Sequence, residues 1–256
     1  MLRKDKKAQV TIFVILAILI VAAIILLFVL YQKNSLSIKP TSSDNPKDFL
    51  ESCIQDNLEE AIEKVITNSG YIQLPQKTKS YKGKDIPYLC YTENTNEKCY
   101  PSESVWIEHL ENEIHNYMNN KVSNCVNQME DDYKSRAYQV SVNYKGFAVS
   151  LVPDKVKVTI DADITTKKAD EQRKFSSVEI NAFTPLYELA VIVHKIIYQE
   201  SKYCNSDYPL IMRTNTWVEI TKDQTGDDEK VYTVMDTKTG KTMQFALRNC
   251  VLPTPS

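Results

Sequence analysis

The sequence predicts an α+β fold, and two periodic patterns carry that prediction. Between residues 46 and 132, apolar residues recur every three or four positions in two stretches, which is the period of an amphipathic α-helix. After residue 137, apolar and polar residues alternate, which is the period of a β-strand. A third observation, an apolar block from Val10 to Tyr31, predicts a single N-terminal transmembrane helix ahead of this fold.

The apolar block contains no charged residue, no proline and no glycine. At about 1.5 Å per residue it makes a helix of roughly 33 Å, which matches the thickness of a bilayer core. A secretory signal peptide is the alternative, but its apolar part usually has about 7 to 15 residues and ends at a small-residue cleavage site. Basic residues are denser before the block than after it. We therefore expect a cell-membrane protein with a cytoplasmic N-terminus and an extracellular C-terminal domain.

The residues at the start of this block carry a resemblance to a known class of leader. They read Lys6-Lys7-Ala8-Gln9-Val10-Thr11-Ile12-Phe13. This stretch resembles the archaeal class III signal peptide of type IV pilin-like proteins, in which a membrane peptidase cuts between a small residue and Gln. The resemblance implies processing between Ala8 and Gln9, a prepilin-type peptidase as partner, and self-assembly through the retained helix. Phe13 stands where many pilins keep a Glu that orders assembly.

A second resemblance covers the start of the region after the block. Cys53 is followed by a predicted helix that ends in Gly70-Tyr71-Ile72. In this pattern the chain is similar to uncharacterised membrane-anchored surface proteins of small-genome archaea. That resemblance implies a location at the cell surface and no particular activity.

The cysteines favour an oxidising compartment. All six follow the apolar block, and an even number suits a set of disulfide bonds, although six buried thiols are the alternative. Fifteen pairings exist, and the predicted elements narrow them. Two cysteines lie near ends of the long helices that an antiparallel arrangement brings together, and two flank a short loop. The predicted pairs are Cys53 with Cys125, Cys90 with Cys99 and, by elimination, Cys204 with Cys250.

The helical stretches define the first part of the exported region. Residues 1–8 form a basic leader, 9–31 the transmembrane helix, 32–45 a polar linker and 46–132 a helical hairpin subdomain. The first long helix begins at Pro46 and stops at Gly70, and the second follows Pro101 and extends to Met129. Residues 86–91 between them read as a strand.

The alternating stretches define an α+β subdomain over residues 133–256. Four strands form an antiparallel β-meander, and a helix from Leu186 to about Ser201 packs against it. A C-terminal three-stranded meander follows, with turns at Gly226 and Gly240. The expected strands are 138–144, 147–151, 156–162, 178–182, 217–220, 231–235 and 243–247.

Composition excludes two functional classes. Residues 1–9 carry four basic residues and one acidic residue, so the remaining chain carries 27 basic and 32 acidic residues. A mildly acidic domain without basic clusters does not suit nucleic acid, which requires grouped Lys and Arg. The five glycines lie too far apart to form a phosphate-binding loop.

Candidate chemical groups are sparse. His109 and His115 are six positions apart on one predicted helix and do not share a face, while His194 is expected to be a hydrogen-bonded core residue. Several acids occur in pairs that are expected at strand ends or turns, and none has the spacing of a calcium loop. These acids are Asp131, Asp132, Asp161, Asp163, Asp227, Asp228 and Glu229. We therefore expect no enzyme, no metal site and no cofactor.

Aromatic residues leave a binding role open. Trp106, Trp217 and 15 tyrosines could form a carbohydrate- or protein-binding surface, or they could pack the core. The sequence favours a membrane-anchored extracellular surface protein, pilin-like, with a structural or adhesive role. The alternative is a non-polymerising anchored ectodomain that binds a ligand or stabilises a membrane complex.

The resemblance to pilin-like leaders predicts that the mature chain begins at Gln9. Cleavage removes four of the basic residues, whereas a simple signal anchor keeps them. N-terminal sequencing or intact mass of the protein from its native source measures this directly. A chain that still starts at Met1 would contradict the resemblance and leave the non-polymerising alternative.

Overall fold

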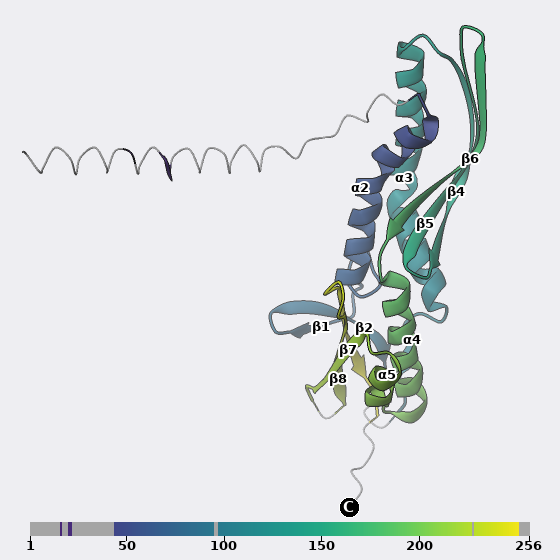
Figure 1. The fold of residues 1–256 in the computed structure, drawn as a ribbon. Coiled ribbons are helices and arrows are strands. Elements are labelled where there is room, and N and C mark those ends of the chain that lie inside the picture. The colour runs from purple at the N-terminus through teal and green to yellow at the C-terminus, as the bar shows by residue number, and fades with distance from the viewer. Residues whose placement is uncertain (1–15, 17–19, 22–43, 95–96, 227, 251–256) are drawn as a thin grey trace, which may run out of the picture. The chain divides into compact units, whose positions relative to one another are not determined.

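The computed structural model describes residues 16, 20–21, 44–94, 97–226 and 228–250. Residues 44–250 belong to one compact unit of α+β structure (Figure 1). Its helices are α2 (Pro46–Thr67), α3 (Trp106–Ser135), α4 (Leu186–Tyr203) and α5 (Tyr208–Thr214). Its strands are β1 (Thr78–Tyr81), β2 (Lys84–Tyr91), β3 (Tyr100–Pro101), β4 (Gln139–Val152), β5 (Lys155–Lys168), β6 (Glu171–Phe183), β7 (Val218–Gln224), β8 (Glu229–Asp236) and β9 (Thr242–Arg248).

The structure corrects the prediction of a transmembrane helix over residues 9–31. Among the described residues, no helix is long and apolar enough to cross a membrane. Only Leu16, Ile20 and Val21 of that segment are described, and a bilayer crossing needs about 20 consecutive helical residues. The predicted leader 1–8, the junction between Ala8 and Gln9, and residues 32–43 of the predicted linker lie outside the described residues.

The two long helices lie antiparallel, as the sequence predicts (Figure 1). The side chain of Asn45 accepts a hydrogen bond from the backbone N–H of Lys47, so it caps α2 at Pro46. Each helix buries one apolar stripe, and α3 continues beyond the predicted end to Ser135. The Cys53–Cys125 disulfide joins the first half of α2 to the second half of α3.

The first sheet has three antiparallel strands in the order β4-β5-β6, where the sequence predicted four. The predicted strands 138–144 and 147–151 are one continuous strand, β4. Its register with β5 shifts at a bulge between Tyr144 and Gly146. An extra residue in one strand interrupts the alternation of apolar and polar side chains, and a sequence pattern reads that interruption as a strand end. Gly146 has a φ of +124°, which an L side chain rarely adopts.

The second sheet contains the predicted C-terminal meander and extends it. Its order is β1-β2-β9-β8-β7, with β3 paired to β2. Strand β2 lies parallel to β9, so a segment of the predicted helical region joins the sheet of the C-terminal region. Strand β1 and helix α5 were not predicted, since each is short and carries no clear period.

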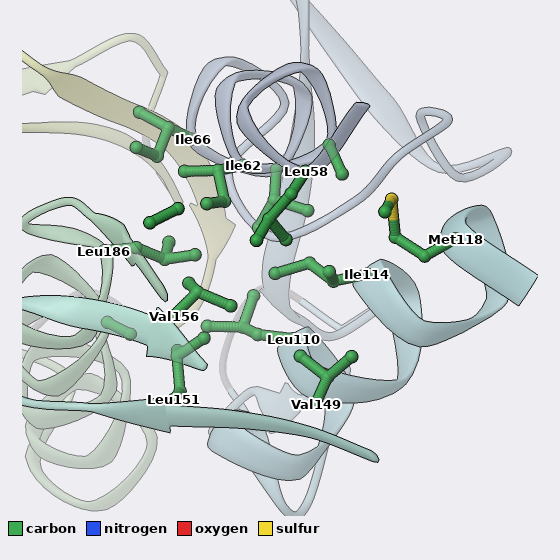
Figure 2. Close-up of a cluster of buried hydrophobic side chains, with 14 of the residues drawn as sticks. Leu58, Ile62, Ile66, Leu110, Ile114, Met118, Val149, Leu151, Val156 and Leu186 are labelled. Atoms are coloured by element: carbon green, nitrogen blue, oxygen red, sulfur yellow. The ribbon is translucent and has the colours of Figure 1, made fainter. Parts of the chain in front are cut away.

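One hydrophobic core holds these elements together. Figure 2 shows Leu58 and Ile62 of α2 and Leu110 and Ile114 of α3 in one cluster with Val149 and Leu151 of β4, Val156 of β5 and Leu186 of α4. The cluster includes side chains from both sides of residue 132. Helix α4 contacts strands of both sheets, so it connects the two sheets.

Three disulfides cross-link the unit, and their pairs agree with the predicted ones. They join Cys53 to Cys125, Cys90 to Cys99 and Cys204 to Cys250. The disulfide between α2 and α3 closes a loop of 72 residues. A disulfide that closes a loop of that size raises the free energy of unfolding by about 2 to 5 kcal/mol.

Gly70 fits the end of α2 against the second long helix. Its φ is +109°, and a Cβ at this position would lie 2.3 Å from Cη2 of Trp106. Trp106 is only 3% exposed and cannot move outward without opening the core.

We therefore expect Gly70→Ala to lower the free energy of unfolding by about 3 kcal/mol, through backbone strain and steric overlap together. Gly83→Ala is the matched control, because Gly83 also has a positive φ but no atom within 4 Å of its added Cβ. Its cost should be near 1 kcal/mol, from strain alone. Urea unfolding of the oxidised protein measures both, and equal losses would contradict the contact with Trp106.

Candidate functional site

A groove lies where the ends of both sheets meet the start of α4. Its first hollow has a volume of about 510 Å³. Aromatic, hydroxyl and charged side chains share the lining, and none of them comes from the middle of a strand or helix. They are Asp154, Phe183, Thr184, Pro185, Glu188, Trp217, Asp236, Lys238, Thr239 and Lys241.

Two further hollows continue around Lys241. One, of about 530 Å³, shares Phe183, Thr184 and Lys241 with the first and reaches α2. The other, of about 550 Å³, shares Glu63 and Lys241 with the second and reaches the start of β2. We refer to the three hollows together as the Lys241 groove.

The turn between β8 and β9 forms one wall of the first hollow. Asp236 is buried, and its Oδ1 accepts hydrogen bonds from the backbone N–H groups of Lys238 and Thr239 at 3.1 and 2.6 Å. The next residue, Thr237, donates from its backbone N–H and from Oγ1 to the carbonyl of Trp217, at 2.9 and 2.8 Å. These bonds fix the turn and hold Trp217 against it.

The opposite wall joins the turn between β4 and β5 to the first turn of α4. The backbone N–H of Asp154 donates to Oε1 of Glu188 at 2.9 Å, and the backbone N–H of Thr184 donates to the carbonyl of Asp154 at the same distance. Two buried atoms of this wall, Oε2 of Glu188 and Oγ1 of Thr184, have no hydrogen-bond partner among the described residues. Such atoms cost free energy unless a ligand or water satisfies them.

An aromatic side chain stands at the mouth of the groove. Phe183, the last residue of β6, is 83% exposed, although large apolar side chains are usually covered. Trp217 is half-buried and lines the same hollow. The groove therefore combines aromatic side chains with hydroxyl and charged ones, and a mainly apolar lining with a few polar groups is the usual composition of a ligand site.

The three histidines do not form a site. Nδ1 of His109 lies 3.6 Å from Oε2 of Glu103, and the ring stacks on Trp106. His115 stacks on Phe147 of β4. The prediction that His194 is a core residue is wrong, because it lies on the exposed side of α4 between the buried positions of the apolar stripe. No group of His, Cys, Asp and Glu suited to a metal occurs in the described part of the chain.

Five of the seven paired acids make ion pairs with basic residues. Asp132 pairs with Arg136, and Arg248 pairs with Asp228. Asp161 and Asp163, expected at a strand end, lie within β5 and share Lys145 of β4. Strand β5 continues for five residues beyond Asp163, so these two acids do not lie at a turn. Asp131 is exposed, Glu229 pairs with Lys79, and Asp227 lies outside the described residues.

The structure separates the two tryptophans. Trp106 is buried and packs against Gly70, so it belongs to the core. Trp217 lines the Lys241 groove. Trp217 is half-buried and also packs against the hydrophobic core.

A buried ionic cluster lies outside the groove, and sequence reasoning did not identify it. Glu200 of α4 is fully buried, and its Oε2 accepts hydrogen bonds from Nζ of Lys230 at 2.6 Å and from Nδ2 of Asn249 at 3.1 Å. The hydroxyl of Tyr232 donates to Oε1 of the same carboxylate. Glu200 extends the apolar stripe of α4 by a helical step, and this position was the available signal.

Burial changes the acidity of the groups around this carboxylate. Burial, followed by the nearby charge of Glu200, raises the pKa of Tyr232 far above its usual value, so its hydroxyl stays a donor. Burial lowers the pKa of Lys222, which lies 3.8 Å from Oε1 of Glu200. None of the hollows of the Lys241 groove includes these residues, and we interpret the cluster as structural.

Comparisons with known proteins give no relative for this chain. No family model matches it, and no curated protein or solved structure is similar to it. Its function therefore rests on the geometry of its own residues.

We expect Glu200→Gln to lower the free energy of unfolding by about 3 kcal/mol or more, because it leaves Lys230 charged and buried without an ionic partner. Glu60→Gln is the control, because Glu60 forms an exposed pair with Lys64 that contributes about 0 to 1 kcal/mol. Urea unfolding of the oxidised protein measures both variants. Equal losses of unfolding free energy in the two variants would show that the buried cluster stabilises the protein no more than an exposed ion pair does.

Proposed function

We propose that this protein is a recognition domain that works outside the cytosol and binds a ligand through the Lys241 groove. The observation that carries the proposal is the first hollow, which the exposed Phe183 and the half-buried Trp217 line together with hydroxyl and charged side chains. This is the ligand-binding alternative of the sequence analysis, and it also supplies the contact that an adhesive role requires.

The proposal is one of binding rather than catalysis. Three acids line the first hollow, and one of them, Asp154, is exposed. Asp236 holds the backbone of its turn through Oδ1, and Glu188 holds the backbone of Asp154 through Oε1. Both carboxylates are therefore engaged in shaping the walls. Polar groups that are held in fixed positions suit selective binding of a ligand.

The cysteines support a location outside the cytosol. All six are paired in disulfides, and such bonds persist in oxidising compartments. The pilin-like part of the prediction, with processing at Ala8 and self-assembly, depends on residues outside the described part of the chain, and it stays a prediction.

A location outside the cytosol predicts that protein from its native source carries no free thiol. Alkylation under denaturing conditions without reductant should leave the intact mass unchanged, and alkylation after reduction should add six groups. Six groups taken up without reductant would contradict both the disulfides and the location.

Binding through the groove predicts that Phe183→Ala weakens attachment of the purified full chain to cell envelopes of its source. Loss of one well-packed aromatic contact costs roughly 1.4 kcal/mol or more, so we expect at least a tenfold higher dissociation constant. Tyr203→Ala is the matched control, because Tyr203 is 61% exposed and lies outside the groove. Equal binding of both variants, or no binding by the wild type, would count against the proposal.

A further inference from the structure

We propose that Nζ of Lys230 and the side-chain amide of Asn249 join in an intramolecular isopeptide bond with loss of ammonia, and that Glu200 carries the protons of this step. The bond lies in the buried cluster around Glu200, so it is independent of the Lys241 groove and of the function proposed for that groove. It is supported by the contacts of the three side chains, the polarity around the amide, the exclusion of water and the strand register.

The three side chains meet at one oxygen atom. Oε2 of Glu200 lies 2.6 Å from Nζ of Lys230 and 3.1 Å from Nδ2 of Asn249. Nζ is held further by the backbone carbonyl of Cys204, at 2.5 Å. The carboxylate therefore contacts both the nitrogen that attacks and the nitrogen that leaves. Two groups held in this way react far faster than the same groups free in solution.

The surroundings of Asn249 polarise its amide for attack. Oδ1 accepts hydrogen bonds from the backbone N–H groups of Cys99 and Cys250, at 3.0 and 2.8 Å. Nδ2 donates to the backbone carbonyl of Glu200 at 2.6 Å and to its Oε2. Donors on one side and acceptors on the other fix the amide in one orientation. Two backbone donors at the oxygen form an oxyanion hole, which stabilises the charge that develops there during attack.

Burial excludes water from the reacting groups. Glu200 and Asn249 are fully buried, and Lys230 is 3% exposed. Burial disfavours the charged form of an amine, and only the neutral form is a nucleophile. The same surroundings lower the pKa of Lys222, chiefly through burial. The hydroxyl of Tyr232 donates to Oε1 of Glu200, so Oε2 is the oxygen that serves both nitrogens.

The strand register brings Lys230 and Asn249 to the same face of the second sheet. Lys230 of β8 pairs with Leu247 of β9. Asn249 continues this ladder, because its backbone N–H donates to the carbonyl of Asp228 at 2.9 Å. Asn249 is thus two residues beyond the partner of Lys230, and long side chains reach each other from such diagonal positions. The bond joins segments that the sheet already holds side by side.

The step is balanced without a further reactant. Oε2 of Glu200 takes one proton from the ammonium of Lys230, and the neutral Nζ attacks Cγ of Asn249. Glu200 gives this proton to Nδ2 and takes a second one from Nζ. The bond between Cγ and Nδ2 then breaks, and Nδ2 leaves as ammonia. Ammonia takes the remaining proton and departs as ammonium, which leaves Glu200 as a carboxylate.

The bond adds a link that reductants do not break. The adjacent Cys204–Cys250 disulfide holds the same chain segment to the end of α4. Reduction opens that disulfide, whereas an amide between Lys230 and Asn249 persists. The segment after β9 is therefore held to β8 by a covalent bond under both oxidising and reducing conditions.

A tryptic digest of the full chain, reduced and alkylated under denaturing conditions, tests the bond directly. Trypsin does not cleave after a lysine whose Nζ is acylated. We therefore expect a branched peptide in which residues 223–238 are joined through Lys230 to the peptide that begins at Asn249. Its mass should be lower than that of the two separate peptides by one ammonia molecule. Fragmentation must locate the branch, because cyclisation of Asn or of an N-terminal Gln also releases ammonia.

Two variants test the assigned roles, and a third is the matched control. Lys230→Arg removes the nucleophile and keeps the positive charge, while Glu200→Gln removes the proton carrier. Neither should contain the branched peptide. Lys222→Arg should contain as much of it as the wild type, because Lys222 contacts Oε1 of Glu200 and the exposed Asn205 instead.

The wild-type digest decides the proposal even if a variant does not fold. Separate peptides with unmodified Lys230 and Asn249, from a chain whose disulfides were intact before reduction, overturn the bond. A branch in equal yield in folded Glu200→Gln overturns the role of Glu200, which the proposal requires. A branch that starts from Lys222 places the chemistry elsewhere and overturns the assignment.

Discussion

The structure depends on a buried hydrogen-bonded junction around Asn249. Its Nδ2 donates to the backbone carbonyl of Glu200 at 2.6 Å, and its Oδ1 accepts from the backbone N–H groups of Cys99 and Cys250 at 3.0 and 2.8 Å. A single fully buried amide therefore connects the C-terminal end of α4 to two disulfides. The adjacent carboxylate of Glu200 binds Lys230 of β8, which adds the second sheet to the same junction.

This junction has consequences at the other end of α4. The helix is fixed at Glu200 and Cys204, and its first turn forms a wall of the Lys241 groove through Glu188. The second wall, the turn after β8, belongs to the strand that carries Lys230. Both walls are thus parts of elements that the junction holds together. A groove built this way keeps its shape without a ligand, which lowers the entropic cost of binding.

The exposed Phe183 and the two residues with unsatisfied polar atoms, Thr184 and Glu188, all belong to the lining of the first hollow. Phe183, the last residue of β6, is 83% exposed, and Thr184 leads directly into α4. Elsewhere in the first sheet the apolar side chains face the long helices. Exposed apolar surface and unsatisfied buried polar atoms are each unfavourable for folding.

The sequence predicted the long helices, most strands and the disulfide pairs of this protein, because apolar periodicity locates the helices and strands and the position of each cysteine on them narrows the pairing. It misread the bulge at Gly146, where one extra residue breaks the alternation. It also predicted a membrane helix from apolar length alone, and no helix among the described residues has that character.

Only the tertiary structure decided the site. The groove gathers Asp154, Phe183, Glu188, Trp217 and Asp236 from four separate segments, around residues 154, 183–188, 217 and 236–241, and none of these residues forms a motif with its sequence neighbours. The same holds for Glu200, Lys230 and Asn249, which read as ordinary polar residues until burial places them together. Their roles arise from burial and from contacts between distant parts of the chain, and a local sequence pattern records neither.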